Sequence, residues 1–180
     1  YHLILADDER NAKEIYEDYR FYDKNVYFYP AKDLLFFQAD IHGNLLIRQR
    51  MRVTRALLEQ DEVTVVTSID GCMDFLMPLE KIRSSLLHFK SDSVIDLDQL
   101  KADLVELGYE RTGQVELPGQ FSVRGGIIDI YPLTEDNPWR IELWDDEVDS
   151  IRSFDAESQR SLENVDEITI YPAVEKMDGK

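Results

Sequence analysis

The densest group of side chains that could do chemistry is a set of four carboxylates, Asp145, Asp146, Glu147 and Asp149. Clustered carboxylates can hold a hard cation when their oxygens converge on one point. Here they surround a tight Asp145–Asp146 corner, and successive side chains on a strand point to opposite faces. No histidine or glycine geometry in this stretch completes a coordination shell. We therefore predict a solvated hairpin corner and no metal site.

Nucleophilic catalysis finds no support either. The single cysteine, Cys72, and the three histidines, His2, His42 and His88, fall on separate predicted elements. No Ser/His/Asp or Cys/His set is apparent, so we expect no catalytic residues, and no zinc-ligand spacing exists. A lone cysteine forms no internal disulfide, which fits a reducing, cytoplasmic compartment. We expect Cys72 to be a small buried apolar side chain.

The run Trp139–Trp144 suggests binding chemistry. Its period of two places Ile141 and Leu143 on one face, and Arg140 and Trp144 on the other. A tryptophan beside an arginine on a non-core face is the usual composition of an interface hot spot. Two ordinary explanations stay open: a helix of the same chain covers Trp144, or Arg140 pairs with a cross-strand carboxylate.

Arg124 is a third candidate for the same face. It precedes Gly125–Gly126, a pair that suits a β-bulge or the close approach of another backbone. A bulge there would aim Arg124 towards Arg140 and Trp144. We therefore expect the three side chains to form a single patch.

Strand-like runs flanked by turn formers would position this patch. They are Gly126–Tyr131, Trp139–Trp144 and Glu147–Phe154, with a weaker run near Gln114–Leu117 and a last one, Asp166–Tyr171, that closes the sheet. Asp129 lies between Ile128 and Ile130 and should face away from whatever they bury. A strand over Leu86–Lys90 and a helix over Leu97–Leu107, capped by Asp96 and ended by Gly108, come before these runs. This pattern predicts an α+β domain with a mostly antiparallel sheet.

Residues 1–85 alternate strands and helices, which implies βαβ crossovers and a parallel sheet of helicase-like layout. The predicted strands are His2–Ala6, expected to be buried, Asn25–Tyr29 and Val63–Thr67. Such sheets bind ligands at the carboxyl edge of their strands. The segments that follow the strands, ADDER, YPAKD and TSIDG, are not glycine-rich, and no G-x-x-x-x-G-K-[ST] motif occurs. We expect no nucleotide site here.

A long helix from about Asn44 to Glu59 carries one unusual residue, Arg50, inside its apolar arc. A buried arginine must be paired. We predict a carboxylate or carbonyl partner for Arg50.

Charge separates the two halves of the 180-residue chain, whose net charge is −17. Residues 1–85 carry 11 basic and 15 acidic side chains, and residues 86–180 carry 9 and 22. The second half, at −13, repels phosphates, so we expect no direct nucleic-acid binding. No apolar run approaches the roughly 20 residues that span a bilayer, so we expect no membrane partner. The chain opens in a strand without an initiator Met, and we expect it to be a fragment.

Several segments together resemble a known family. FSVRGGIIDIYP, RIELWDDEVDSIRSFD, ESQRS and EITIYPA are similar to the UvrB-homology module of bacterial transcription-repair coupling factors (Mfd). UvrB carries related patterns, but its long tyrosine-rich insertion is replaced here by the short YPAKDLLFFQADIHGN. SFDAESQRS also looks like the coupling-factor version.

The resemblance implies a degenerate, partial helicase-like α/β domain over residues 1–85, a UvrA-interaction domain over 86–172 and a tail over 173–180. It implies that Arg124, Arg140 and Trp144 bind UvrA, although the family usually has Phe in place of Trp144. No metal or cofactor is implied for this fragment, because ATP and Mg belong to the parent's motor domains. An intramolecular contact with the rest of the parent chain is also implied.

The function implied is that of a non-catalytic module, which recruits the nucleotide-excision-repair protein UvrA to RNA polymerase stalled at DNA damage. Two alternatives remain open. The chain could be a fragment of an ATP-dependent, UvrB-like DNA helicase whose ATP site lies outside it, or a purely structural, autoinhibitory domain.

Overall fold

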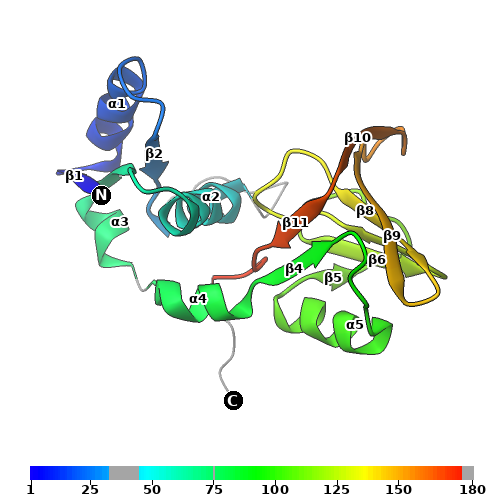
Figure 1. Cartoon of the computed structure of the whole chain (residues 1–180). Coiled ribbons are helices and arrows are strands. Elements are labelled where there is room, and N and C mark those ends of the chain that lie inside the picture. Colours follow the sequence, from blue (N-terminus) through cyan, green and yellow to red (C-terminus); the bar gives the residue numbers. More distant parts are fainter. Residues whose placement is uncertain (33–44, 75, 176–180) are drawn as a thin grey trace. The chain divides into compact units, whose positions relative to one another are not determined.

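The computed structural model describes residues 1–32, 45–74 and 76–175. Two compact units make up the chain, Tyr1–Leu79 and Glu80–Lys180 (Figure 1), and each is described by itself. None of the helices in the described ranges combines the length and the apolar character that crossing a bilayer requires.

Unit 1 holds a three-stranded sheet in which both pairings are parallel, in the order β1-β3-β2. Its strands are β1 (His2–Ala6), β2 (Val26–Tyr29) and β3 (Thr64–Ser68). Its helices are α1 (Glu9–Tyr19), α2 (Leu45–Glu59) and α3 (Ile69–Met73). α1 begins where Asp8 accepts a hydrogen bond from the backbone N–H of Asn11, the N-cap geometry. Ala12 of α1 then packs on Val26 and Val66 of the sheet.

Two burial predictions for unit 1 are wrong. β1 is largely exposed, because it is an edge strand and the period of two sends only Ile4 and Ala6 into the core cluster under α1. Leu3 and Leu5 lie on the opposite face and are exposed. Cys72 is also exposed. In the short helix α3 the buried position is occupied by Gly71, where a side chain would collide with Oγ1 of Thr67. Cys72, the next residue, points to solvent.

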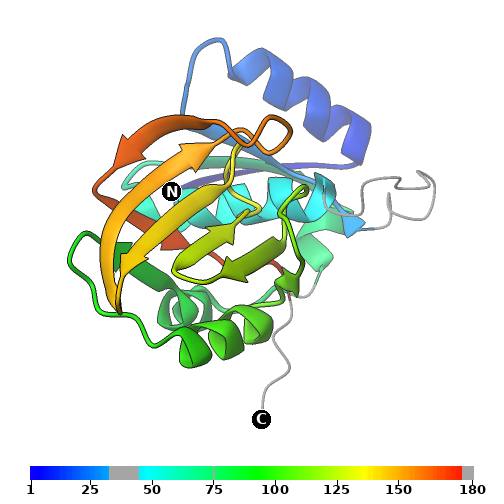
Figure 2. The ribbon, with the colours of Figure 1, turned by 90° about the vertical axis from the view of Figure 1, so that its right-hand side faces the viewer.

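Unit 2 is built on a six-stranded sheet in the order β10-β9-β8-β7-β6-β5 (Figure 2). Only the β5–β6 pairing is parallel, and the other pairings are antiparallel. The strands are β5 (Glu110–Arg111), β6 (Gln120–Arg124), β7 (Ile127–Ile130), β8 (Trp139–Trp144), β9 (Glu147–Phe154) and β10 (Ser161–Val165). The helix α5 (Leu97–Glu106), capped by Asp96, buries Leu100 and Leu104. A second helix, α4 (Leu79–Ser85), spans the junction of the two units.

The last predicted strand does not close this sheet. β11 (Glu167–Ile170) pairs instead with β4 (Leu87–Lys90) in a separate two-stranded antiparallel sheet. One residue, Asp166, separates β10 from β11, which is too short for a hairpin back onto β10. No strand forms at 114–117 either. The backbone N–H groups of Glu116 and Leu117 donate to the side chain of Gln120, and the strand comes later, as β6.

Two tight hairpins set the ends of the central strands. β6 and β7 are joined by Gly125–Gly126, with Gly125 at φ +60, and β8 and β9 by the predicted Asp145–Asp146 corner. Gly126 is approached closely, as predicted: its carbonyl accepts from the N–H of Leu143 at 2.8 Å, and a Cβ there would lie 3.1 Å from the carbonyl oxygen of Leu143. The other possibility offered for the glycine pair, a bulge, is not realised there, because the β6–β7 register is regular. A separate register shift occurs in the β8–β9 ladder.

Candidate functional site: the charged outer face of the six-stranded sheet

The two faces of the sheet differ sharply in composition. Cross-strand partners share a face, so the register defines each face row by row. One row is apolar: it joins the partly buried Val123 to the fully buried Ile128, Ile141 and Ile151. The adjacent row on the opposite face is polar: Ser122, Asp129, Arg140 and Arg152. Asp129 therefore faces away from the isoleucines, as predicted, and the candidate arginines gather around it.

Asp129 is the centre of this face, and its side chain has no exposure to solvent. One carboxylate oxygen accepts from Nε of Arg140 at 2.7 Å. The other accepts from Nη2 of Arg140 at 2.8 Å and from Nη2 of Arg124 at 3.0 Å. A buried carboxylate thus holds two guanidinium groups, one of them in bidentate geometry.

Arg140 is largely enclosed. Its side chain is 12% exposed, also donates to Oε1 of Gln159 at 3.1 Å, and lies 4.2 Å above the ring centre of Phe154. The hydrogen bonds to Asp129 raise the pKa of Arg140. The cross-strand carboxylate left open by the sequence is therefore present, and most of this guanidinium is already engaged within the chain.

Arg124 is in a different situation. Its side chain is 47% exposed, and it donates to the shared carboxylate of Asp129 through a single nitrogen, Nη2. The remaining N–H groups of this guanidinium are available to an external acceptor. Arg124 is thus the accessible cation of the pair.

Trp144 is 81% exposed at the end of β8, so the covering helix that the sequence left open is not found in the described part of the chain. The register places Arg124 opposite Ile127 and Ile127 opposite Glu142, with Trp144 one step further along the same face. Standard strand spacings put the Cα atoms of Arg124 and Trp144 roughly 12 Å apart. The three predicted residues share a face, but only the two arginines meet.

Sequence reasoning missed Arg152, which lies opposite Arg140 and donates to Glu142 at 2.8 Å. That hydrogen bond lowers the pKa of Glu142 and raises the pKa of Arg152. A regular ladder from the Asp145–Asp146 turn would place Ile151 opposite Arg140, and the bulge moves Arg152 there. The sequence holds a signal for this bulge: Val148 and Ile151 are both apolar but three residues apart, so a strand of period two can bury both only with an extra residue between them.

The carboxyl edge of the parallel sheet in unit 1 holds a second charged cluster. Nη1 of Arg50 donates to Asp74 at 2.6 Å and to the carbonyl of Pro30 at 2.9 Å, so both predicted partner types are confirmed. The carboxylate of Glu9 accepts from Oγ of Ser68 and from the backbone N–H of Ala31. These side chains occupy the edge at which parallel sheets bind ligands.

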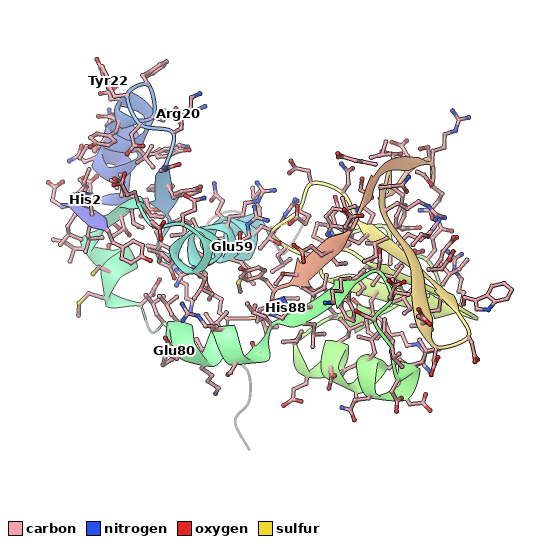
Figure 3. The ribbon with its side chains drawn as sticks, in the orientation of Figure 1. His2, Arg20, Tyr22, Glu59, Glu80 and His88 are labelled. Atoms are coloured by element: carbon pink, nitrogen blue, oxygen red, sulfur yellow. The ribbon has the colours of Figure 1, made fainter. Side chains whose placement is uncertain are left out.

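The remaining reactive residues are dispersed. His2 lies on β1 and His88 on β4, in different units (Figure 3), and His42 falls outside the described residues. Within the described ranges, His, Cys, Asp and Glu side chains form no group of three or more that could hold a metal ion.

Comparison with known proteins assigns this chain to a family. Residues 87–175 match the family model described as the UvrB interaction domain. The transcription-repair-coupling factor of Bacillus subtilis is 44% identical over 153 residues, 85% of this chain and 13% of that protein. Those of Staphylococcus epidermidis and Staphylococcus aureus are 36% identical over 173 residues, 95% of this chain and 15% of theirs. The chain thus spans less than a sixth of these curated relatives, and it belongs to the transcription-repair-coupling factor family, with a UvrB interaction domain over residues 87–175.

Proposed function

We propose that residues 86–172 form a docking surface for UvrA, and that in a longer coupling factor this surface recruits UvrA to RNA polymerase stalled at DNA damage in the cytoplasm. The supporting observation is the outer face around Asp129. Its half-exposed guanidinium, Arg124, lies in a half of the chain with 9 basic and 22 acidic side chains. On such a background, an exposed guanidinium is a distinctive donor for a partner's carboxylates.

The three residues of this face would play different parts. Arg124, which is accessible, contacts an acidic group of UvrA. Trp144 offers a large exposed ring to an apolar pocket, as hot-spot tryptophans do. Arg140 is mostly enclosed and acts through Asp129, whose position fixes that of Arg124. The parent's ATP and Mg chemistry is assigned to segments other than this chain.

No comparable observation favours the helicase alternative. Among the described residues, the carboxyl edge of the parallel sheet is filled by Glu9 and Arg50 with partners from the same unit. An ATP site contributed by this edge would require those contacts to break. Binding is therefore the function that the described geometry supports best.

The test is a titration of purified UvrA onto the immobilised chain. We expect Arg124→Ala to weaken binding about 30-fold, equivalent to ~2 kcal/mol, as a hot-spot truncation does. Arg111→Ala is the matched control, because Arg111 is exposed on β5 but in register with the buried Phe121 of the core face. Equal affinity of wild type and Arg124→Ala would overturn the assigned patch, and no binding by the wild type would overturn the partner.

A further inference from the structure

An exposed valine lies in the same row as Trp144. Val94 forms an antiparallel bridge with Glu147, and Glu147 is the ladder partner of Trp144. Because cross-strand partners share a face, the three side chains form one row with an apolar residue at each end. Val94 is 71% exposed and Trp144 is 81% exposed. This row, called the strip below, thus presents two exposed apolar side chains on either side of the Glu147 carboxylate. Large exposed apolar side chains that gather in one place mark interaction sites.

The backbone holds Val94 in this position. Ser93 accepts from the N–H of Val148 at 2.8 Å, and the N–H of Ile95 donates to the carbonyl of Asp146 at 2.8 Å. Asp92 adds a third bond to the carbonyl of Val148 at 3.1 Å. Ile95, next to Val94, is buried. The residues before and after Val94 are therefore both hydrogen-bonded to the β8–β9 corner, which fixes the position of Val94. A partner that docks on Val94 loses little binding free energy to ordering of the backbone.

The charge around the strip has one sign. Segments 91–96 and 141–151 contain no Lys, Arg or His. Their acidic residues are Asp92, Asp96, Asp145, Asp146, Glu147 and Asp149, together with Glu142, whose charge is already paired with Arg152. A partner that covers Val94 and Trp144 must bring apolar atoms to the strip and basic groups to its border, because like charges there would be repelled.

We propose that the UvrA-docking surface extends past Trp144 onto Val94, and that this end of the surface enters an apolar pocket bordered by Lys or Arg. The inference rests on the proposed function and adds a second contact to it. Arg124 then pairs with an acidic group of UvrA at one end of the docking surface, and the carboxylates of the β8–β9 corner pair with basic groups of UvrA at the other end. Opposite requirements at the two ends allow only one orientation of the bound partner.

The experiment measures UvrA affinity for Val94→Asp and Val94→Ala in the full chain, with Val105→Asp as the control. Val105 is 59% exposed on α5 and is away from the strip. We expect a loss of about tenfold or more for Val94→Asp and about threefold for Val94→Ala, as for truncation of an interface residue. The control should stay within about twofold. Thermal melts compare folding, and Val94→Ala keeps the test valid if Val94→Asp melts early.

A charge reversal tests the pocket border. Glu147→Lys reverses the charge between Val94 and Trp144, and it should weaken binding several-fold when the partner brings basic groups to this end of the surface. Unchanged or stronger binding would overturn that part of the inference. Unchanged affinity of both Val94 variants, with Arg124→Ala still weakened, would overturn the extension alone. If the wild-type chain does not bind UvrA, the proposed function and this inference fall together.

Discussion

Each of the two units contains an arginine–aspartate cluster, and the two clusters differ in which partner is buried. In unit 1 the arginine is the buried partner: Arg50 is 2% exposed and Asp74 is 20% exposed. In unit 2 the carboxylate is the buried partner: Asp129 has no exposure and Arg124 is 47% exposed. The same pair of chemical groups therefore ends in opposite positions with respect to solvent.

The difference distinguishes an ion pair that is satisfied within its own unit from one that leaves a charged group exposed to a binding partner. Arg50 is matched within unit 1 by a carboxylate and a carbonyl, so its charge is satisfied where it lies. Asp129 carries one negative charge and meets two guanidinium groups, which leaves one positive charge in surplus. The surplus resides on the more exposed of the two, Arg124. The candidate site is thus the point at which internal pairing leaves a charge unmatched.

The largest effect is expected from Asp129→Asn. This change keeps the shape of the side chain but leaves Arg140, 12% exposed, without its counter-ion. Breaking a buried ion pair from one side costs about 3–5 kcal/mol of unfolding free energy. Urea denaturation followed by tryptophan fluorescence reports on unit 2, because Trp139 and Trp144 both lie there. Asp149→Asn, at an exposed residue, is the control; a loss below about 1 kcal/mol for Asp129→Asn would contradict the central role of Asp129.

Arg50→Met should affect the other unit. Asp74 and the carbonyl of Pro30 lose the hydrogen bonds from Arg50, although Asp74 keeps the one from the backbone N–H of Lys32. We expect a loss of about 3 kcal/mol of unfolding free energy, at the low end of the range because Asp74 also retains some solvent contact. Far-ultraviolet circular dichroism reports mainly on unit 1, which holds α1, α2 and α3, and the tryptophan signal of unit 2 identifies the part of the change that comes from unit 2. UvrA affinity should stay unchanged. A matching loss of UvrA binding would show that the two clusters are not functionally separate.

Local patterns in the sequence were enough to predict several features of the two clusters and of the strands that carry them. Strands β8 and β9 begin and end at the predicted residues, since alternation and the Asp145–Asp146 corner are both local. The partner of Arg50 was predictable because a single charge inside an apolar helical arc must be paired. Strand parity placed Trp144 on the non-core face, and left open whether a helix of the same chain covers it.

The rest depends on contacts between distant residues. Burial of Asp129 is decided by two arginines from other strands, and the position of Arg152 by a bulge that shifts the ladder by one residue. Val94 joins the row of Trp144 only because segment 91–95 pairs with the β8–β9 corner. Cys72 is exposed because its neighbour Gly71 takes the inner position. No periodicity within one element contains this information.

Arg140→Ala and Arg124→Ala should separate stability from binding. Arg140 has three acceptor contacts and a ring beneath it, so its loss should cost about 2–3 kcal/mol of unfolding free energy. Arg124 is half-exposed, so its loss should cost under about 1 kcal/mol while still weakening UvrA binding. Arg140→Lys should recover only part of the stability, because an ammonium cannot form the bidentate pair. Equal stabilities of the two alanine variants would show that the arginines are equivalent.

The smallest effect concerns the Glu142–Arg152 pair, which completes the charged face without a buried member. The hydrogen bond from Arg152 lowers the pKa of Glu142 below its ordinary value of 4.5. A lowered folded-state pKa means that the pair stabilises the protein at neutral pH, and that this stabilisation is lost as the pH falls through the folded pKa. The side chain of Arg152 is 20% exposed and that of Glu142 is 35% exposed, so solvent screening keeps the contribution of the pair to the unfolding free energy under about 1 kcal/mol. Urea midpoints between pH 7 and pH 3 should therefore fall less steeply for Glu142→Gln than for wild type, with the exposed Glu163→Gln as control. If Glu142→Gln follows the wild-type curve throughout, the pair adds no stability, and the buried carboxylate of Asp129 alone organises the face.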